Sequence, residues 1–166
     1  MRYVENSLRL LEPEKDLDLY RQAFEWRKPK KHLSPPRIDW EDFTANSPTN
    51  LTIGLFNGEL QALYFFQEYY PRHFEAHFSS RKGVPRETVL QGGKEVLNLI
   101  LSNGGEQVDA LVLTINRPLR RFVTQLGMEQ VGHCEFSTCE DLLKGSSILT
   151  RNQRREQMFV RYAKRA

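Results

Sequence analysis

The sequence has little of several features that would narrow its class at once. Its 166 residues include only two cysteines, Cys134 and Cys139, so we expect no disulfide framework and a reducing compartment. No apolar run approaches the roughly 20 residues that span a bilayer, and we expect no membrane partner. The first residues, MRYVENSLRLLEPEKD, contain acids and no apolar core, so we expect no secretory signal and a cytoplasmic location.

Residues with metal-ligand chemistry are also sparse. His133, Cys134 and Cys139 lie close together, but no second ligand pair follows them at the spacing of a zinc finger. A structural zinc ion normally takes four protein ligands. We therefore predict that the protein binds no metal.

Positive and negative charges nearly balance, and the net charge is only +3. The cations are nevertheless clustered, at residues 27–32 and in the C-terminal segment 151–166. Such clusters are either solvated surface or contacts with an anionic partner. Because no nucleic-acid-binding motif accompanies them, we do not expect nucleic acid as a partner. We expect segment 151–166 to contact protein, either in a homo-oligomer or in a larger assembly.

Apolar periodicity predicts strands and helices in alternation, and the length favours a single domain over residues 1–166. The pair Asn57-Gly58 predicts a hairpin with a type I′ turn, in which both central residues have positive φ. The predicted strands are Ser7–Leu11, Leu51–Phe56, Glu59–Tyr70, His73–Phe78, Ala110–Ile115, Met128–Phe136 and Gln157–Tyr162, and the predicted helices are Asp16–Trp26, a helix that has Pro85 in its first turn and runs to Leu101, and Leu119–Leu126.

The stretch His73–Leu101 is the most informative part of the chain. Phe74, Ala76 and Phe78 alternate with His73, Glu75 and His77, which is typical of a strand with one buried face. A basic loop with Gly83 and Pro85 follows, and then an apolar helical pattern. A helix N-terminus offers free N–H groups and partial positive charge, and Arg81, Lys82 and Arg86 lie beside it. This arrangement favours binding of a phosphate.

The order of elements resembles the GNAT superfamily of acyl-CoA-dependent N-acetyltransferases. The resemblance spans Leu8 to Tyr162 and is strongest in two blocks. Phe74–Leu101 is similar to the pyrophosphate-binding motif of that superfamily, and Val112–Gly132 is similar to its late block, with Asn116 and Gly127 matching. The implied fold is α/β (α+β): a mixed, mostly antiparallel sheet with a central parallel splayed strand pair and helices on both faces.

The resemblance also implies a function, acetyl transfer from acetyl-CoA to a small-molecule or protein amine. The pantetheine arm would enter between Phe74–Phe78 and Ala110–Ile115, and backbone N–H groups of Lys82–Arg86 would hold the pyrophosphate. The residues expected to bind the cofactor are Phe78, Ser79, Ser80, Arg81, Lys82, Gly83, Val84, Arg86 and Asn116.

Three residues on one strand face are the candidate catalytic residues. Glu75, His73 and His77 would take a proton from the amine before it attacks, directly or through water. The alternative is structural: histidines on a strand are often hydrogen-bonded and partly buried, and Glu75 would then pair with a histidine or with Arg72.

The chain departs from the superfamily pattern at several positions. Ser80 and Pro85 stand at the ends of the phosphate-binding loop motif, and Pro85 has no N–H to donate. Val123 occupies the position of a tyrosine that protonates the departing thiolate, and Met128 replaces an aromatic residue.

A second resemblance, to GNAT-like proteins of tailed bacteriophages, rests mainly on His73–Leu101 and on the size of the chain. It implies an alternative in which the protein is a non-catalytic virion or head-assembly component with protein partners. Fold alone does not decide between the two.

Overall fold

The structure is a computed structural model that describes residues 6–26, 50–134 and 159–166. These residues fall into two compact units. The first comprises residues 6–26, 50–108 and 165–166, and the second comprises residues 109–134 and 159–164. The basic cluster at residues 27–32, Cys139 and the first half of segment 151–166 lie outside the described residues. Their predicted roles, like the prediction of a single domain, stay predictions.

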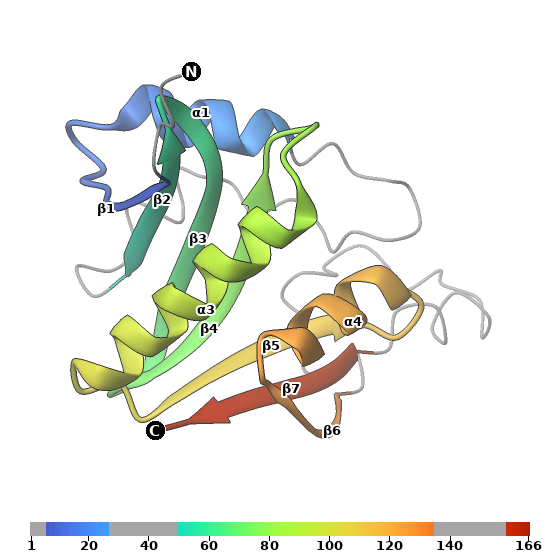
Figure 1. Cartoon of the computed structure of the whole chain (residues 1–166). Helices are drawn as coiled ribbons and strands as arrows, with labels where there is room; N and C mark the ends of the chain where they lie inside the picture. Colours follow the sequence, from blue (N-terminus) through green and yellow to red (C-terminus); the bar gives the residue numbers. More distant parts are fainter. Residues whose placement is uncertain (1–5, 27–49, 135–158) are drawn as a thin grey trace, which may run out of the picture. The chain divides into compact units, whose positions relative to one another are not determined.

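The predicted order of strands and helices is confirmed, with shifts of one to three residues at several ends (Figure 1). The elements are β1 (Ser7–Leu10), α1 (Leu17–Trp26), β2 (Leu51–Asn57), β3 (Glu59–Tyr70), β4 (His73–Ser80), α3 (Arg86–Ser102), β5 (Gln107–Leu113), α4 (Arg117–Gln125), β6 (Glu129–Cys134) and β7 (Phe159–Arg165).

The sheet of the first unit is built from antiparallel neighbours in the order β1-β2-β3-β4. In its β3–β4 hairpin, Tyr64 faces Phe78 and Gln67 faces Glu75. At the start of β4 the carbonyl of Arg72 accepts hydrogen bonds from the N–H groups of Glu106 (2.8 Å) and Gln107 (3.4 Å). Strands β4 and β5 therefore begin at the same point.

Helices cover both faces of this sheet, as predicted. Tyr64 and Phe65 are neighbours on β3, so their side chains point to opposite faces. Phe65 packs on Tyr20 of α1, with ring centroids 6.3 Å apart, whereas the Tyr64 hydroxyl donates to the Val89 carbonyl of α3 (2.7 Å). Figure 1 shows α3 crossing β3 and β4. The face of β4 that bears Phe74, Ala76 and Phe78 is thus the α3 face.

The turn between β2 and β3 differs from the prediction. Gly58 has a φ of 73°, but Asn57 keeps an ordinary negative φ and belongs to β2, where it pairs with Glu59. A type I′ turn needs positive φ at both positions, so the predicted turn type is wrong although the hairpin is confirmed. A register irregularity at Leu55/Phe56 accompanies this tight turn. The sequence pair alone could not reveal it.

The second unit contains most of β5, followed by α4, β6 and β7. Its strands lie in the order β5-β7-β6, and β6 pairs antiparallel with β7, from Glu129 opposite Ala163 to Cys134 opposite Phe159. Strand β5 starts three residues earlier than predicted and ends at Leu113, because Thr114 and Ile115 form the turn into α4. Gly127, with a φ of 86°, follows α4 as predicted.

The fold class predicted from the sequence is confirmed: the protein is a mixed α/β structure with a mostly antiparallel sheet. The predicted splay between β4 and β5 concerns strands that belong largely to different units, and it stays a prediction. Among the described helices, none is long and apolar enough to cross a membrane.

Candidate functional site

The loop between β4 and α3 has the geometry of a small backbone cradle. The N–H of Arg81 donates to the Gln61 carbonyl (2.8 Å) and the N–H of Val84 to the Arg81 carbonyl (3.3 Å), which closes a tight turn. Gly83 within this turn has a φ of 90°, and a Cβ added there would meet no atom within 4 Å. The N–H groups of Lys82 and Gly83 have no hydrogen-bond partner among the described residues. Glycine therefore permits a turn that leaves backbone donors open.

The helix that follows begins without a side-chain cap. Pro85 is the N-cap residue of α3 (φ −57°, ψ 135°), and its side chain makes no capping hydrogen bond. Pro85 was expected inside the first turn, and the structure moves it to the position just before the helix. The result for an anion is the same, because Pro85 donates nothing while the first-turn N–H groups keep their partial positive charge.

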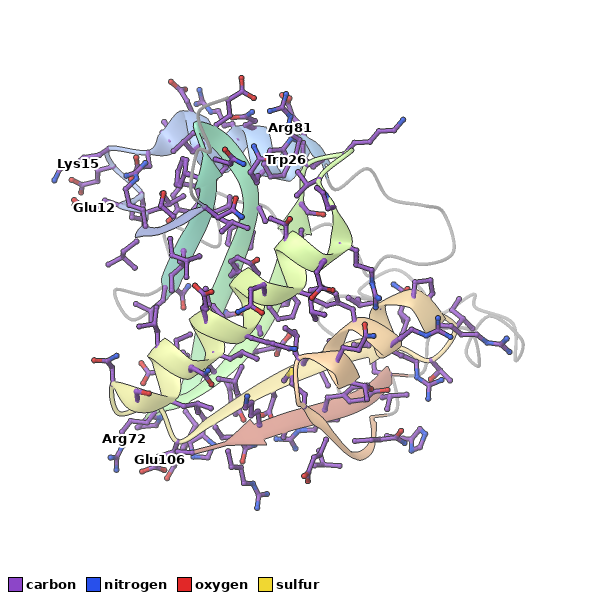
Figure 2. The ribbon with its side chains drawn as sticks, in the orientation of Figure 1. Glu12, Lys15, Trp26, Arg72, Arg81 and Glu106 are labelled. Atoms are coloured by element: carbon purple, nitrogen blue, oxygen red, sulfur yellow. The ribbon has the colours of Figure 1, made fainter. Side chains whose placement is uncertain are left out.

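The three cations of this loop are not equivalent. Arg81 forms an ion pair with Glu59 on β3, so its guanidinium already has a carboxylate partner. Lys82 is exposed and forms no ion pair among the described residues. Arg86 is the first residue of α3 and is also exposed. In Figure 2, Arg81 lies at one end of the first unit, and Arg72 and Glu106 lie at the other.

Residues just before the loop serve the packing of the first unit. Phe78 packs edge-on against Tyr64, with ring centroids 5.8 Å apart. Ser79 is buried, and its hydroxyl donates to the Ala23 carbonyl of α1 (3.2 Å). Ser80 is exposed and Val84 half-buried. Of the residues expected to contact the cofactor, Ser79 thus has its hydroxyl committed to α1.

Glu75 and His77 form a close acid–imidazole pair on the α1 face of β4. The distance between Glu75 Oε1 and His77 Nε2 is 3.2 Å, and their side chains are 30% and 15% exposed. The two groups are close but not aligned for a hydrogen bond, and the buried Nε2 atom makes none with the described residues. The geometry leaves an imidazole nitrogen available next to a carboxylate that solvent can reach.

His73 is separated from this pair and has other partners. Its Nε2 lies 3.4 Å from Glu106 Oε2, and the same carboxylate forms an ion pair with Arg72 at 2.6 Å. The rings of Tyr69 and Tyr70 pack edge-on against His73, with centroids 6.2 and 5.3 Å away. The structure therefore brings Glu75 and His77 together, whereas His73 lies apart from them beside Glu106 and two tyrosines.

In the second unit, Asn116 is the N-cap of α4. Its Oδ1 accepts a hydrogen bond from the N–H of Leu119 (3.2 Å), which satisfies one donor of the first turn. Val123 is fully buried in the core, so this position supplies no proton donor. The predicted role of Asn116 in cofactor binding is compatible with its position and stays a prediction.

Sequence analysis missed two residues that shape this region, Glu59 and Glu106. Each pairs with a cation distant in the sequence, Glu59 with Arg81 and Glu106 with Arg72 and His73. No local spacing marks such contacts, because the strand pairing of the first unit creates them. The only sequence signal is the position of Glu59 directly after the predicted Asn57-Gly58 turn.

Comparisons with known proteins identify structural relatives only. No family model matches the chain, and no curated protein matches its sequence. Among solved structures, an N-acetyltransferase from Staphylococcus aureus Mu50 has a TM-score of 0.72 at 12% identity, covering 97% of each chain. A Bacillus subtilis acetyltransferase in complex with CoA has a TM-score of 0.69 at 12% identity, covering 98% of this chain and 99% of that one.

A third solved structure, the ribosomal-protein-S18-alanine N-acetyltransferase from Escherichia coli, has a TM-score of 0.66 at 13% identity, covering 96% of this chain and 92% of that one. These likenesses extend over nearly the full length of every chain compared. At such low identity they establish the fold, and they support the resemblance to the GNAT superfamily at that level.

Proposed function

Because the chain has the fold of these N-acetyltransferases, we propose that it binds acetyl-CoA and transfers the acetyl group to an amine. The observation that carries the proposal is the β4–α3 connection: a glycine turn with open N–H groups leads into an uncapped helix start. Free backbone donors at a helix N-terminus are suited to phosphate oxygens. Acetyl-CoA would present its pyrophosphate to such a cradle and would supply an acyl group activated as a thioester.

The residues present fit a pyrophosphate group. The open space beside Gly83 admits a ligand close to the backbone, and Lys82 adds a cation that has no carboxylate partner among the described residues. Arg81 would contribute less, because Glu59 already shares its charge. We infer that the backbone of Lys82 and Gly83, with the Lys82 side chain, carries most of the attraction for phosphate.

Glu75 and His77 would handle the proton of the amine. An amine attacks only as the free base, so a proton acceptor must lie within reach of the ammonium form or of a bridging water. The Glu75 carboxylate is partly exposed, and the His77 Nε2 atom stands 3.2 Å behind it. A proton taken by Glu75 could then be shared with the imidazole. His73 is bound to Glu106 and would have no direct part in this transfer.

Val123 limits the second proton transfer, the one to the departing thiolate. A buried valine cannot donate a proton, so water or a residue outside the described segments would have to replace it. The proposal therefore predicts slow turnover with ordinary cofactor binding. General-acid contributions are typically on the order of a hundredfold or more, which sets the size of the expected deficit.

Cofactor binding is the first test. In a calorimetric titration with acetyl-CoA we expect saturable binding, and the K82A variant should weaken it about fivefold, on the order of 1 kcal/mol. The matched control is K15A, which removes an exposed lysine paired with Glu12 in the same unit and should bind unchanged. Absence of heat and of thermal stabilisation at millimolar acetyl-CoA would exclude the proposed function, because a bound ligand must stabilise the folded state.

The catalytic pair is the second test. Acetylation should be measured on a panel of amines that includes spermidine, amino acids and peptides with a free N-terminus, since the solved relatives include a Vibrio cholerae spermidine N-acetyltransferase. We expect E75Q to lower kcat about a hundredfold with little change in the KM for acetyl-CoA. H77Q should lower it less, and H73Q should leave it near the wild-type value. Equal rates for E75Q and wild type would remove Glu75 as the base.

The alternative of a non-catalytic phage virion component gains no support from the solved relatives named above, which are all acetyltransferases. It would become the better account if acetyl-CoA bound but no amine were acetylated by the wild-type protein.

A further inference from the structure

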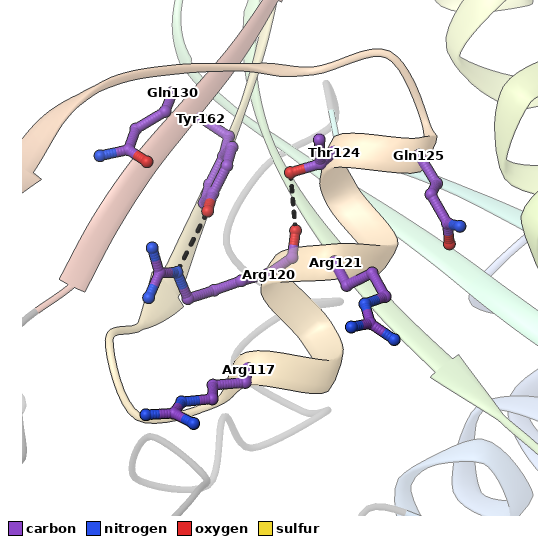
Figure 3. Close-up of a pocket in the computed structure, with 7 residues that line it drawn as sticks. All are labelled: Arg117, Arg120, Arg121, Thr124, Gln125, Gln130 and Tyr162. Atoms are coloured by element: carbon purple, nitrogen blue, oxygen red, sulfur yellow. Dashed lines mark hydrogen bonds between the residues drawn. The ribbon is translucent and has the colours of Figure 1, made fainter.

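The second unit contains a pocket that the proposed function does not use. It has a volume of about 390 Å³ and lies along one side of α4, with Gln130 of β6 and Tyr162 of β7 on its wall (Figure 3). The residues that line it are Arg117, Arg120, Arg121, Thr124, Gln125, Gln130 and Tyr162. Three of the seven are arginines and none is acidic, so the lining is strongly basic.

The helix register explains why the three arginines gather there. Arg117 is followed at i+3 and i+4 by Arg120 and Arg121, positions that share one side of an α-helix. The opposite side of α4 carries Phe122 and Val123, which are buried in the core of the unit. Packing of these two residues therefore leaves the three arginines on the outer side of α4. In Figure 3 the side chains of Arg117 and Arg120 extend to one side of the helix and that of Arg121 to the other.

Arg120 is held in place by neutral groups. Its Nε donates to the Tyr162 hydroxyl (3.2 Å) and its Nη1 to the Thr114 carbonyl (3.2 Å). Tyr162 is only 3% exposed, so a nearly buried side chain fixes this guanidinium from below. Neither partner carries a negative charge. Within the described part of the chain, the side chain is thus oriented by neutral groups alone, and its Nη2 group forms no hydrogen bond there.

The side chains of Arg117 and Arg121 likewise form no ion pair or hydrogen bond within the described part of the chain, and α4 itself contains no Asp or Glu. Three like charges within two turns of a helix repel one another. A bound anion would remove this repulsion and gain several charge-assisted hydrogen bonds.

We infer that this pocket binds a small phosphorylated ligand through Arg117, Arg120 and Arg121. Guanidinium groups match phosphate oxygens in a two-pronged geometry, and three of them suit a dianion better than a single carboxylate. The volume exceeds that of a phosphate group and falls in the range of small-molecule sites, about 300–1,000 Å³. The amides of Gln125 and Gln130 would contact the polar remainder of the ligand.

The test uses inorganic phosphate and phenyl phosphate as probes on the full chain. The side-chain Nε–H signals of the arginines are followed by nuclear magnetic resonance during each titration, and affinity is measured by calorimetry. We expect saturable shifts at Arg120 and Arg121, and R121Q should weaken binding about fivefold. K15Q, which removes a cation of the first unit, should bind like wild type. R120K should bind phosphate more weakly than wild type and more tightly than R120Q. Lysine keeps the positive charge but lacks the two-pronged geometry of the guanidinium group.

Three outcomes would overturn the inference. One is a shift of the same size in R117Q/R121Q, checked for its fold by circular dichroism, because the probe would then bind elsewhere. Another is displacement of phosphate by CoA in the wild type together with loss of CoA binding in R121Q, because the pocket would then belong to the cofactor site. Failure to bind phosphate while acetyl-CoA still binds would reject this pocket alone and leave the proposed function intact.

Discussion

The starts of α3 and α4 both have cations beside a helix N-terminus, but they offer different hydrogen-bond donors to an anion. Both helices follow a strand and a short connection, and cations lie beside both. At α4 the Asn116 side chain caps the first turn, and the arginines offer their side chains. At α3 Pro85 provides no side-chain cap, one of the nearby cations is already paired, and open N–H groups remain in the backbone.

The difference shows that a basic helix start can attract an anion in two separate ways. Where the cap position lacks an acceptor side chain, the backbone donors stay available and the helix dipole adds to them. Where the cap is filled, those donors are occupied in part and only the side chains remain. The sequence signal, a cluster of Arg and Lys near a helix, is the same in both cases. Four variants or conditions test this contrast, starting with the one expected to have the largest effect.

Gly92 should be the most sensitive position supporting the start of α3. A Cβ at this position would lie 2.6 Å from the Tyr64 hydroxyl and 3.2 Å from Leu55. Tyr64 is buried and hydrogen-bonded to Val89, so it cannot move aside cheaply. We expect G92A to lower the free energy of unfolding by about 2 kcal/mol in urea denaturation. The double variant Y64F/G92A should recover part of the loss, whereas G132A, where a Cβ meets nothing, should be near neutral.

Alkaline pH should loosen α3 and leave the cap of α4 untouched. Burial raises the pKa of the Tyr64 hydroxyl, with a smaller effect from Glu95, and burial also raises the pKa of Tyr20. The unfolded chain ionises these groups near pH 10, so the folded state binds more protons above that pH. Stability from these groups is therefore constant below about pH 10 and falls above it, by up to ~1.4 kcal/mol per pH unit for each tyrosine.

Urea denaturation at pH 9 and pH 11 measures this effect. The Y64F variant should lose less stability between the two pH values than wild type, because one of the two raised groups is gone. An identical loss in Y64F would assign the pH dependence to other groups. The Asn116 amide has no ionisable proton in this range, so protection of the α4 amides from hydrogen exchange should change less than that of α3.

The open start of α3 can be closed by one substitution. Pro85→Asp places a carboxylate where it can accept hydrogen bonds from the first turn, and its charge repels phosphate. We expect acetyl-CoA to bind about tenfold more weakly, ~1.4 kcal/mol, in calorimetric titration. Pro85→Ser, which adds a cap without charge, should fall between P85D and wild type. Unchanged affinity in P85D would show that the backbone of this turn does not hold the cofactor.

The cap of α4 should behave differently under parallel changes. N116A removes the acceptor for Leu119 and should lower the free energy of unfolding by about 1 kcal/mol. N116D keeps a good cap, so we expect its stability to remain within about 0.5 kcal/mol of wild type. Phosphate binding to the α4 pocket should fall at most about threefold in N116D, because the arginines bind through their side chains. A tenfold loss would mean that the helix start, and not the arginines, binds the anion.

The parts of the fold and site that local pattern governs could be predicted from the sequence. The alternation in β4 placed Phe74 and Ala76 in the core, and the glycine turn with Pro85 indicated a helix start near Arg86. Features created by pairing across the sheet could not be predicted. His73 was grouped with Glu75 by its spacing, but Glu106 lies beside it because β4 and β5 begin together.

The α4 pocket was missed for a similar reason. The motif RPLRRF contains its three arginines, but their significance depends on Tyr162, a residue 42 positions after Arg120. The type I′ turn was wrong because the bulge near Leu55 changes how β2 enters the turn. The α4 pocket and the partner of His73 were thus missed because a distant strand decides the local geometry, whereas the turn error arose within the hairpin itself.

The ion pair between Arg81 and Glu59 has a consequence for how the protein would respond to ionic strength. Both side chains lie at the surface, so added salt weakens their mutual attraction at the same time as it screens a phosphate from the cations around it. The released guanidinium would compensate part of the lost attraction. Affinity for acetyl-CoA should therefore fall less steeply with salt in wild type than in E59Q. In E59Q, Arg81 has no Glu59 carboxylate from which salt could release it.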